Sequence, residues 1–166
     1  MIAFPDSVSS SPGPLADPSS GAGLDAARSF AERLADLPAG AWLEVGRAVL
    51  RDRLSNPPRA TASAILGATI NGRGLAVAAW YVCDAIETSA FYAGHARGWT
   101  PGDRRAFAAA YAAAEDAALA LLARQFVPAA DCATLVAPFE SLAREALSSG
   151  LVPVTARHRH GGDEHR

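Results

Sequence analysis

The chain has 166 residues, a net charge of −2 and 50% hydrophobic residues, although only 7% of its residues are aromatic. Alanine accounts for the difference, at about a quarter of the sequence, and because alanine is the strongest helix former this composition favours an all-α domain. The mixed charge, with no basic stripe, argues against nucleic-acid binding. The sequence contains no lysine, which excludes Schiff-base chemistry, pyridoxal-phosphate attachment and a phosphate loop ending in Gly-Lys-Ser/Thr.

The composition divides the chain into three segments. Residues 1–23 are rich in Pro, Ser and Gly and residues 151–166 are polar, so both are predicted to be disordered or draped over the domain. Residues 24–150 are predicted to form a compact antiparallel bundle of five to six helices. The N-terminus lacks the basic and apolar regions of a secretory signal, and no stretch of about 18 residues is free of charge. We therefore expect a cytoplasmic protein with no membrane span.

The first half of the chain contains signals for three helices. Asp25 can cap a first helix, which the following Leu-Pro-Ala-Gly breaks, and a second helix is predicted at about 40–54. Asn56 and Pro57 can cap and start a third helix that runs to about Ile70. The apolar positions that define the first helix are Ala27, Phe30, Ala31, Leu34 and Leu37.

Asn71-Gly72 leaves the next connection open to three interpretations. Because Asn-Gly between apolar runs is a strong hairpin signal, a β-hairpin is possible here. The flanking segments are rich in alanine, however, and alanine is depleted in strands. We therefore predict a left-handed helix C-cap at Asn71-Gly72, followed by a new antiparallel helix at about 75–94. A single long helix bent at the glycines is the second alternative.

The second half of the chain begins with the clearest local signal. Thr100, Pro101 and Asp103 combine a threonine cap, a proline in the first turn and an acid three residues after the cap, which predicts a helix running to about Phe126. A last helix is predicted to be interrupted, with Pro138 dividing residues 128–136 from residues 138–148.

The predicted 75–94 helix has two faces that are not purely polar. Its apolar face consists of Leu75, Ala79, Val82, Cys83, Ile86, Ala90 and Ala93. The opposite face carries Trp80, Asp84, Glu87 and Phe91, with His95 aligned just beyond the end. A solvated stripe rarely brackets its acids with large aromatic residues, because these side chains favour burial. This second face is therefore expected to meet another element, a ligand or a partner.

Glu115 is the second unusual acid. On its predicted helix it shares a stripe with Phe107, Tyr111 and Leu119, and a carboxylate among apolar side chains must be paired, protonated or bound to a metal. We expect either a salt bridge to an arginine, such as Arg73 or Arg97, or a hydrogen bond from a tyrosine.

Two classes of function follow from these residues. The first is a non-enzymatic interaction or regulatory module that binds a protein partner or a small ligand, or self-associates as a homodimer. The second is a small helical enzyme with a carboxylate-lined, metal-binding pocket, although the Glu-x-x-His motif of di-iron bundles is missing. No nucleophile, zinc or nucleotide motif occurs, so the first class is preferred and no catalytic residue, metal or cofactor is expected. The candidate binding residues are Trp80, Asp84, Glu87, Phe91, His95 and Glu115.

Overall fold

The computed structural model describes residues 18–53 and 58–149, and these form only helices and their connections. The predicted compact all-α bundle is therefore confirmed. The elements are α1 (Pro18–Leu34), α2 (Ala39–Arg53), α3 (Pro58–Gly72), α4 (Ala76–Gly94), α5 (Pro101–Leu122), α6 (Ala129–Val136), the 3-10 helix η1 (Ala137–Phe139) and α7 (Glu140–Ser149). The predictions for residues 1–17, for the cap at Asn56 and Pro57 and for the tail at 151–166 lie outside the described residues.

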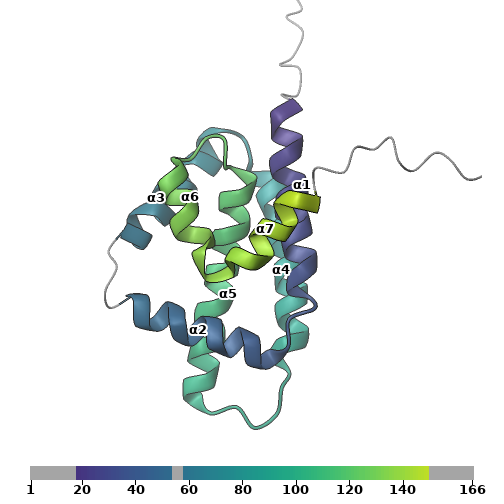
Figure 1. Cartoon of the computed structure of the whole chain (residues 1–166), viewed down its shortest axis with the longest axis vertical. Helices are drawn as coiled ribbons and strands as arrows, with labels where there is room; N and C mark the ends of the chain where they lie inside the picture. Colours follow the sequence, from purple (N-terminus) through teal and green to yellow (C-terminus); the bar gives the residue numbers. More distant parts are fainter. Residues whose placement is uncertain (1–17, 54–57, 150–166) are drawn as a thin grey trace, which may run out of the picture.

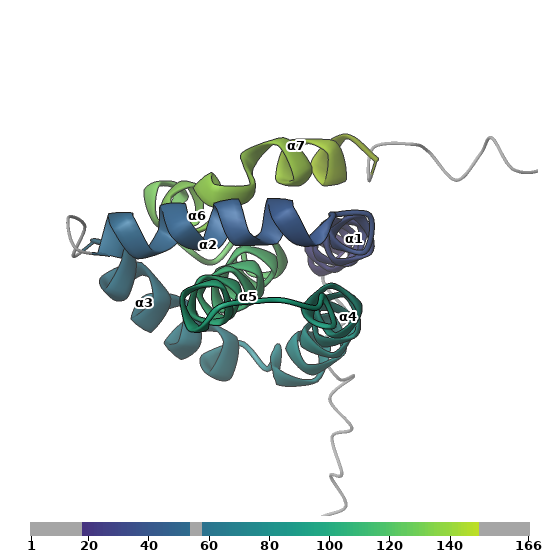
Figure 2. The same cartoon turned by 90° about the horizontal axis from the view of Figure 1, so that it is seen from below.

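Helix α5 is the centre of the bundle. It contacts α1, α2, α3, α4 and α6, and the views in Figure 1 and Figure 2 show α1 and α4 running beside it while α2 lies across it. Its buried side chains are mostly methyl groups, which let neighbouring axes approach closely. They are Ala106, Ala109, Ala110, Ala113, Ala114, Ala117, Ala118, Ala120, Leu121 and Leu122.

Helix α2 crosses α5 at close range. A Cβ atom added to Gly46 would overlap the carbonyl oxygen of Ala106, so the two helices meet backbone against backbone. On either side of this glycine, Trp42 and Val49 are buried. A glycine in this helix therefore serves the close packing of two elements that lie far apart in the sequence.

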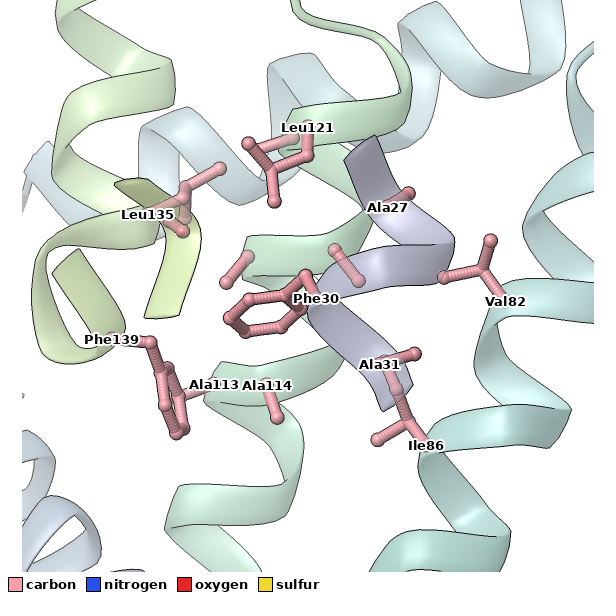
Figure 3. Packing of buried hydrophobic residues seen from close by; sticks show 14 of the residues in the cluster. Ala27, Phe30, Ala31, Val82, Ile86, Ala113, Ala114, Leu121, Leu135 and Phe139 are labelled. Carbon is pink, nitrogen blue, oxygen red and sulfur yellow. The ribbon is translucent and has the colours of Figure 1, made fainter. Parts of the chain in front are cut away.

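The larger core side chains surround the alanine face of α5. Phe30 and Phe139 meet edge to face with ring centroids 5.6 Å apart, and Trp42 lies 5.5 Å from Phe107. Figure 3 shows Phe30 between α5 and the segment that carries Leu135 and Phe139, while Val82 and Ile86 approach from α4. The core thus draws one large side chain or more from α1, α2, α4 and the C-terminal helices.

One predicted helix start and one predicted helix break are confirmed. The Thr100 hydroxyl accepts from the backbone N–H of Asp103 at 3.1 Å, and the Asp103 carboxylate accepts from the backbone N–H of Thr100 at 3.0 Å, which forms a capping box. Pro138 lies in η1, between α6 and α7, where the missing N–H interrupts the helix as expected.

Three predicted boundaries are corrected. Helix α1 was expected to start with a cap at Asp25, but it begins at Pro18 and therefore includes residues 18–23 as its first turns. Helices α3 and α4 are separate, but the left-handed residue is Gly74, with φ of 68°, rather than Asn71 or Gly72. There the Leu75 N–H donates to the Ile70 carbonyl oxygen at 3.1 Å, the long bond of a Schellman motif.

The third correction is the end of α5. This helix ends at Leu122 instead of Phe126, and residues 123–126 turn so that Val127 enters the core. Pro128 follows, and a residue before proline disfavours the helical conformation. No helix in the described part of the chain is long and apolar enough to cross a membrane.

Candidate functional site

The inner face of α4 holds the helix against the bundle. Val82 and Ile86 are fully buried, and α4 contacts α1 and α5 on this side. The Ser89 hydroxyl lies 3.3 Å from the Ala31 carbonyl oxygen of α1 and 3.1 Å from the Ala85 carbonyl oxygen of its own helix. The core side of α4 predicted from periodicity is therefore the side that packs.

The outer face of α4 leaves its large side chains exposed. Of the six large hydrophobic side chains that are exposed in the described part of the chain, five belong to this helix. Their exposed fractions are Val77 69%, Trp80 62%, Tyr81 55%, Phe91 60% and Tyr92 75%. We use the name "outer face" for these five residues together with Asp84, Glu87, Thr88 and His95, which are also exposed.

Sequence reasoning identified only part of this face. It named Trp80, Asp84, Glu87, Phe91 and His95, which the structure brings together on one side of α4. It did not name Val77, Tyr81 and Tyr92. The signal was available, because at 100° per residue these three positions also lie on the side away from Ile86.

Aromatic rings form two groups along the outer face, one toward each end of α4. The Trp80 and Tyr81 rings meet at 5.0 Å, and the Phe91 ring lies 5.7 Å from that of Tyr92 and 4.2 Å from that of His95. The two groups leave Asp84 and Glu87 between them. The face therefore has apolar ends and an acidic middle.

His95 is the C-cap residue of α4, and its ring is held by a hydrogen bond to the backbone of the helix. Its Nδ1 atom lies 2.6 Å from the Phe91 carbonyl oxygen, and since a carbonyl only accepts, the hydrogen bond requires the proton to be on Nδ1. The ring thus satisfies one of the last carbonyls of the helix. Its Nε2 atom is then the imidazole acceptor available to a ligand or partner.

Glu115 lies on the half-buried flank of α5. The Tyr111 hydroxyl lies close enough to the Glu115 carboxylate for an interaction between them to affect the pKa of Tyr111, which fits the tyrosine alternative that the sequence allowed. Burial, followed by this interaction and the charges of Glu115 and Glu87, raises the pKa of Tyr111 to about 12. The Arg73 guanidinium instead stacks over the Phe126 ring at 4.8 Å.

The stripe that carries Glu115 is less buried than its apolar composition implied. Phe107, Tyr111, Glu115 and Leu119 are all half-buried, whereas the alanine side of α5 is fully buried. Glu115 therefore retains access to water, which lowers the cost of its charge.

Cys83 lies close enough to Glu115 to feel its charge. Burial first, and the Glu115 carboxylate second, raise the pKa of the Cys83 thiol to about 11. Burial also raises the pKa of Cys132. Both cysteines are free and half-buried, so at neutral pH they are protonated thiols with little nucleophilic character.

The predicted acids do not converge on a metal-binding constellation. Among the described residues, no three His, Cys, Asp or Glu side chains are close enough together to hold a metal ion. Asp84 and Glu87 are exposed, while Glu115 is half-buried beside Tyr111. The geometry therefore offers an accessible aromatic surface with carboxylates at its middle.

A hollow of about 400 Å³ adjoins the C-terminal end of the outer face. Tyr92 and His95 contribute one side, and the turn after α1, with Ala35 and Leu37, contributes the other. Small side chains form most of its wall, so it can receive an apolar group from a molecule that lies along α4.

Comparison of the chain with models of protein families, with curated proteins and with solved structures finds no match.

Proposed function

We propose that this protein is a non-enzymatic helical interaction module that binds a protein partner through the outer face of α4. The observation that carries the proposal is the gathering of Val77, Trp80, Tyr81, Phe91 and Tyr92 on the solvent side of one helix. Scattered apolar side chains are ordinary on a protein surface, but a group of aromatic side chains on one element is typical of an interface.

The bundle does not need these aromatic rings for its own stability. The inner face of α4 already buries Ala79, Val82, Ile86 and Ala90, and its contacts attach the helix to α1 and α5. A rigid helix that is anchored in this way presents its outer side chains without having to fold on binding. Pre-ordering of this kind lowers the entropic cost of association.

The shape of the surface favours a macromolecule over a small ligand. Small-molecule sites are concave and enclose most of their ligand, whereas Trp80 and Phe91 project from a convex helix about 16 Å apart along the axis, at about 1.5 Å per residue. A partner helix that laid an apolar stripe along α4 would contact both aromatic groups.

Site-specific photo-crosslinking tests the proposal. Benzoylphenylalanine placed at Tyr81 or Tyr92 in the full-length chain is expected to form protein adducts in cells, because both positions belong to the outer face. Trp80→Glu in the same chain should remove these adducts, since it places a charge within the contact. Benzoylphenylalanine at Leu147, an exposed apolar position on α7, is the matched control and should form none of the same adducts.

The contrary result is equally clear. Adducts that persist with Trp80→Glu, or that arise from Leu147 as readily as from Tyr81, would place the interaction elsewhere on the molecule. The same outcome would remove the functional role assigned to Trp80, Phe91 and the acids between them.

A further inference from the structure

We infer that the occupant of the outer face is a second copy of this chain, whose α4 packs antiparallel to the first about the level of Ile86. The inference rests on the proposed function and names its partner. It is carried by the spacing, the symmetry and the area of the outer face, and the position of Asp84 distinguishes the two orientations of the pair.

The spacing is that of a helix which packs along another helix. Val77, Tyr81, Asp84, Thr88, Phe91 and His95 follow one another at intervals of four, three, four, three and four residues. Alternating steps of three and four keep side chains in line along one seam when two helices cross at a shallow angle. Trp80 and Tyr92 flank this seam on its two sides. The length of α4, about 28 Å at 1.5 Å per residue, allows the whole seam to be used.

The outer face is also symmetric in the way that a twofold interface requires. Tyr81 and Phe91 lie at equal distances before and after Ile86, and so do Trp80 and Tyr92. An antiparallel pair would therefore place Tyr81 against Phe91 of the partner subunit, and the reverse. In an isologous dimer each such contact occurs twice, so aromatic residues meet aromatic residues at both ends.

The exposed area is sufficient for such a pair. An aromatic side chain carries roughly 200 Å², so the exposed fractions of Trp80, Tyr81, Phe91 and Tyr92 correspond to about 500 Å² on each chain. Two copies together would offer about 1,000 Å² before Val77 and the rest of the seam are added, which reaches the size of small specific interfaces. Because α4 lies at the edge of the bundle in Figure 2, a second bundle can approach it.

The central acid selects the antiparallel orientation. In a parallel pair, Asp84 would face Asp84 of the partner subunit, and two carboxylates would repel each other inside the contact. In the antiparallel pair, Asp84 faces Thr88 of the partner subunit. The Thr88 hydroxyl donates to the Asp84 carbonyl oxygen of its own helix at 3.0 Å and can rotate to donate to the facing carboxylate.

Sedimentation equilibrium of the purified full-length chain tests the inference. The expected result is a reversible monomer–dimer equilibrium at micromolar concentrations, with a dimer mass twice the 17.1 kDa of the chain. Tyr81→Glu and Phe91→Glu should each raise the dimer dissociation constant at least about tenfold, since each substitution acts twice in the interface. Leu147→Glu adds the same charge to an exposed site on α7 and should leave the constant unchanged. Circular dichroism of each variant checks that the helices remain.

Cysteine crosslinking tests the orientation. Chains carrying Asp84→Cys are mixed with chains carrying Thr88→Cys and oxidised, with the native chain as the baseline for Cys83 and Cys132. The mixture should form covalent dimers faster than either variant alone, because only the mixture puts the two new thiols in one layer. Faster crosslinking of Asp84→Cys chains by themselves would indicate a parallel pair and overturn the antiparallel assignment.

The outcomes separate this inference from the proposed function. A monomer at all concentrations, together with Trp80-dependent adducts to a different protein in cells, would reject the second copy and retain the partner-binding face. A dimer that Tyr81→Glu and Phe91→Glu leave intact would reject the α4 pairing. If cellular adducts at Tyr81 were absent as well, the proposed function would fail with it.

Discussion

The buried face of α5 carries small residues, whereas the outer face of α4 carries large aromatic residues that remain exposed. On α5, eight of the ten buried residues are alanine, while α4 leaves two tyrosines, a tryptophan and a phenylalanine exposed. Hydrophobicity alone would bury the aromatic rings first. The inner positions of the bundle are instead governed by the distance between axes, because the small alanine side chains of α5 let the helices that contact it approach closely.

This comparison separates two uses of apolar residues in one small protein. Alanine on α5 and glycine at Gly46 allow close packing, which supports stability through many short contacts. The aromatic rings of α4 add apolar surface on the solvent side of the helix, away from the core of the bundle. The predictions below test that separation, from the largest expected effect on stability to the smallest.

The two tryptophans Trp42 and Trp80 provide the most direct test. Trp42 is 0% exposed and Trp80 is 62% exposed, so Trp42→Ala should lower the free energy of unfolding by about 3–5 kcal/mol through lost burial and a cavity. Trp80→Ala should change it by less than about 0.5 kcal/mol in the monomer. Urea unfolding at a concentration below dimer formation measures both. Equal losses for the two variants would mean that Trp80 is part of the core.

Gly46→Ala tests the close crossing of α2 and α5. The new Cβ atom would overlap the Ala106 carbonyl oxygen, which is backbone and cannot rotate away, so we expect a loss of about 1–3 kcal/mol in the free energy of unfolding. Gly67→Ala on α3 is the control, because nothing lies within 4 Å of its added Cβ atom. That control should be neutral or stabilise by up to about 1 kcal/mol, since alanine is the better helix former. A stable Gly46→Ala protein would show that the axes are farther apart.

Thr100→Ala tests how the start of α5 is fixed. Removing the hydroxyl deletes the bond that it accepts from the Asp103 N–H, and loss of an N-cap costs about 1 kcal/mol. Thermal unfolding measures the change. The Asp103 carboxylate keeps its ion pair with Arg47 at 2.7 Å, so the loss should stay well below that of Trp42→Ala. Thr134→Ala, on an exposed hydroxyl in the middle of α6, is the comparison variant that leaves every cap intact.

The last expected effect is absent at neutral pH and concerns Tyr111 of α5, which lies near Glu115 and feels the charge of Glu87 on α4. The pKa of Tyr111 is raised to about 12 in the folded state, above the usual value of about 10 for a tyrosine. A raised pKa means that the folded state holds the proton more tightly, so this contribution is complete below pH 10 and is lost between about pH 10 and pH 12. Unfolding midpoints measured across this range should fall less steeply in Tyr111→Phe than in the native chain. An identical pH dependence of the two proteins would contradict the raised pKa of Tyr111.

The sequence predicted the elements of the fold well because their signals are local. The Thr100–Asp103 capping box depends on four consecutive residues, and the Pro138 interruption depends on one missing N–H group. The inner face of α4 followed from periodicity, since Val82 and Ile86 are a turn apart. The end of α3 was less certain. Gly72 and Gly74 both permit a left-handed conformation, and only the completed Schellman bond from Leu75 to Ile70 distinguishes them.

The candidate surface could be predicted only in part. Local spacing was enough to place Trp80 and Phe91 opposite the core face of α4, but exposure also depends on which helices pack beside α4, which a local pattern does not specify. For the same reason the burial of the Glu115 stripe was overestimated: α5 turns its alanine side to the centre, and Tyr111 rather than an arginine reaches Glu115.

The sequence by itself determined that the chain is helical, where most helices begin or break, and which side of each helix is apolar, because these properties arise from interactions within a few residues. Only the tertiary structure decided that alanine occupies the centre and that four aromatic rings remain outside. The physical reason is that burial depends on the distances between helix axes, and those distances are set where residues far apart in the chain meet, as Gly46 meets Ala106.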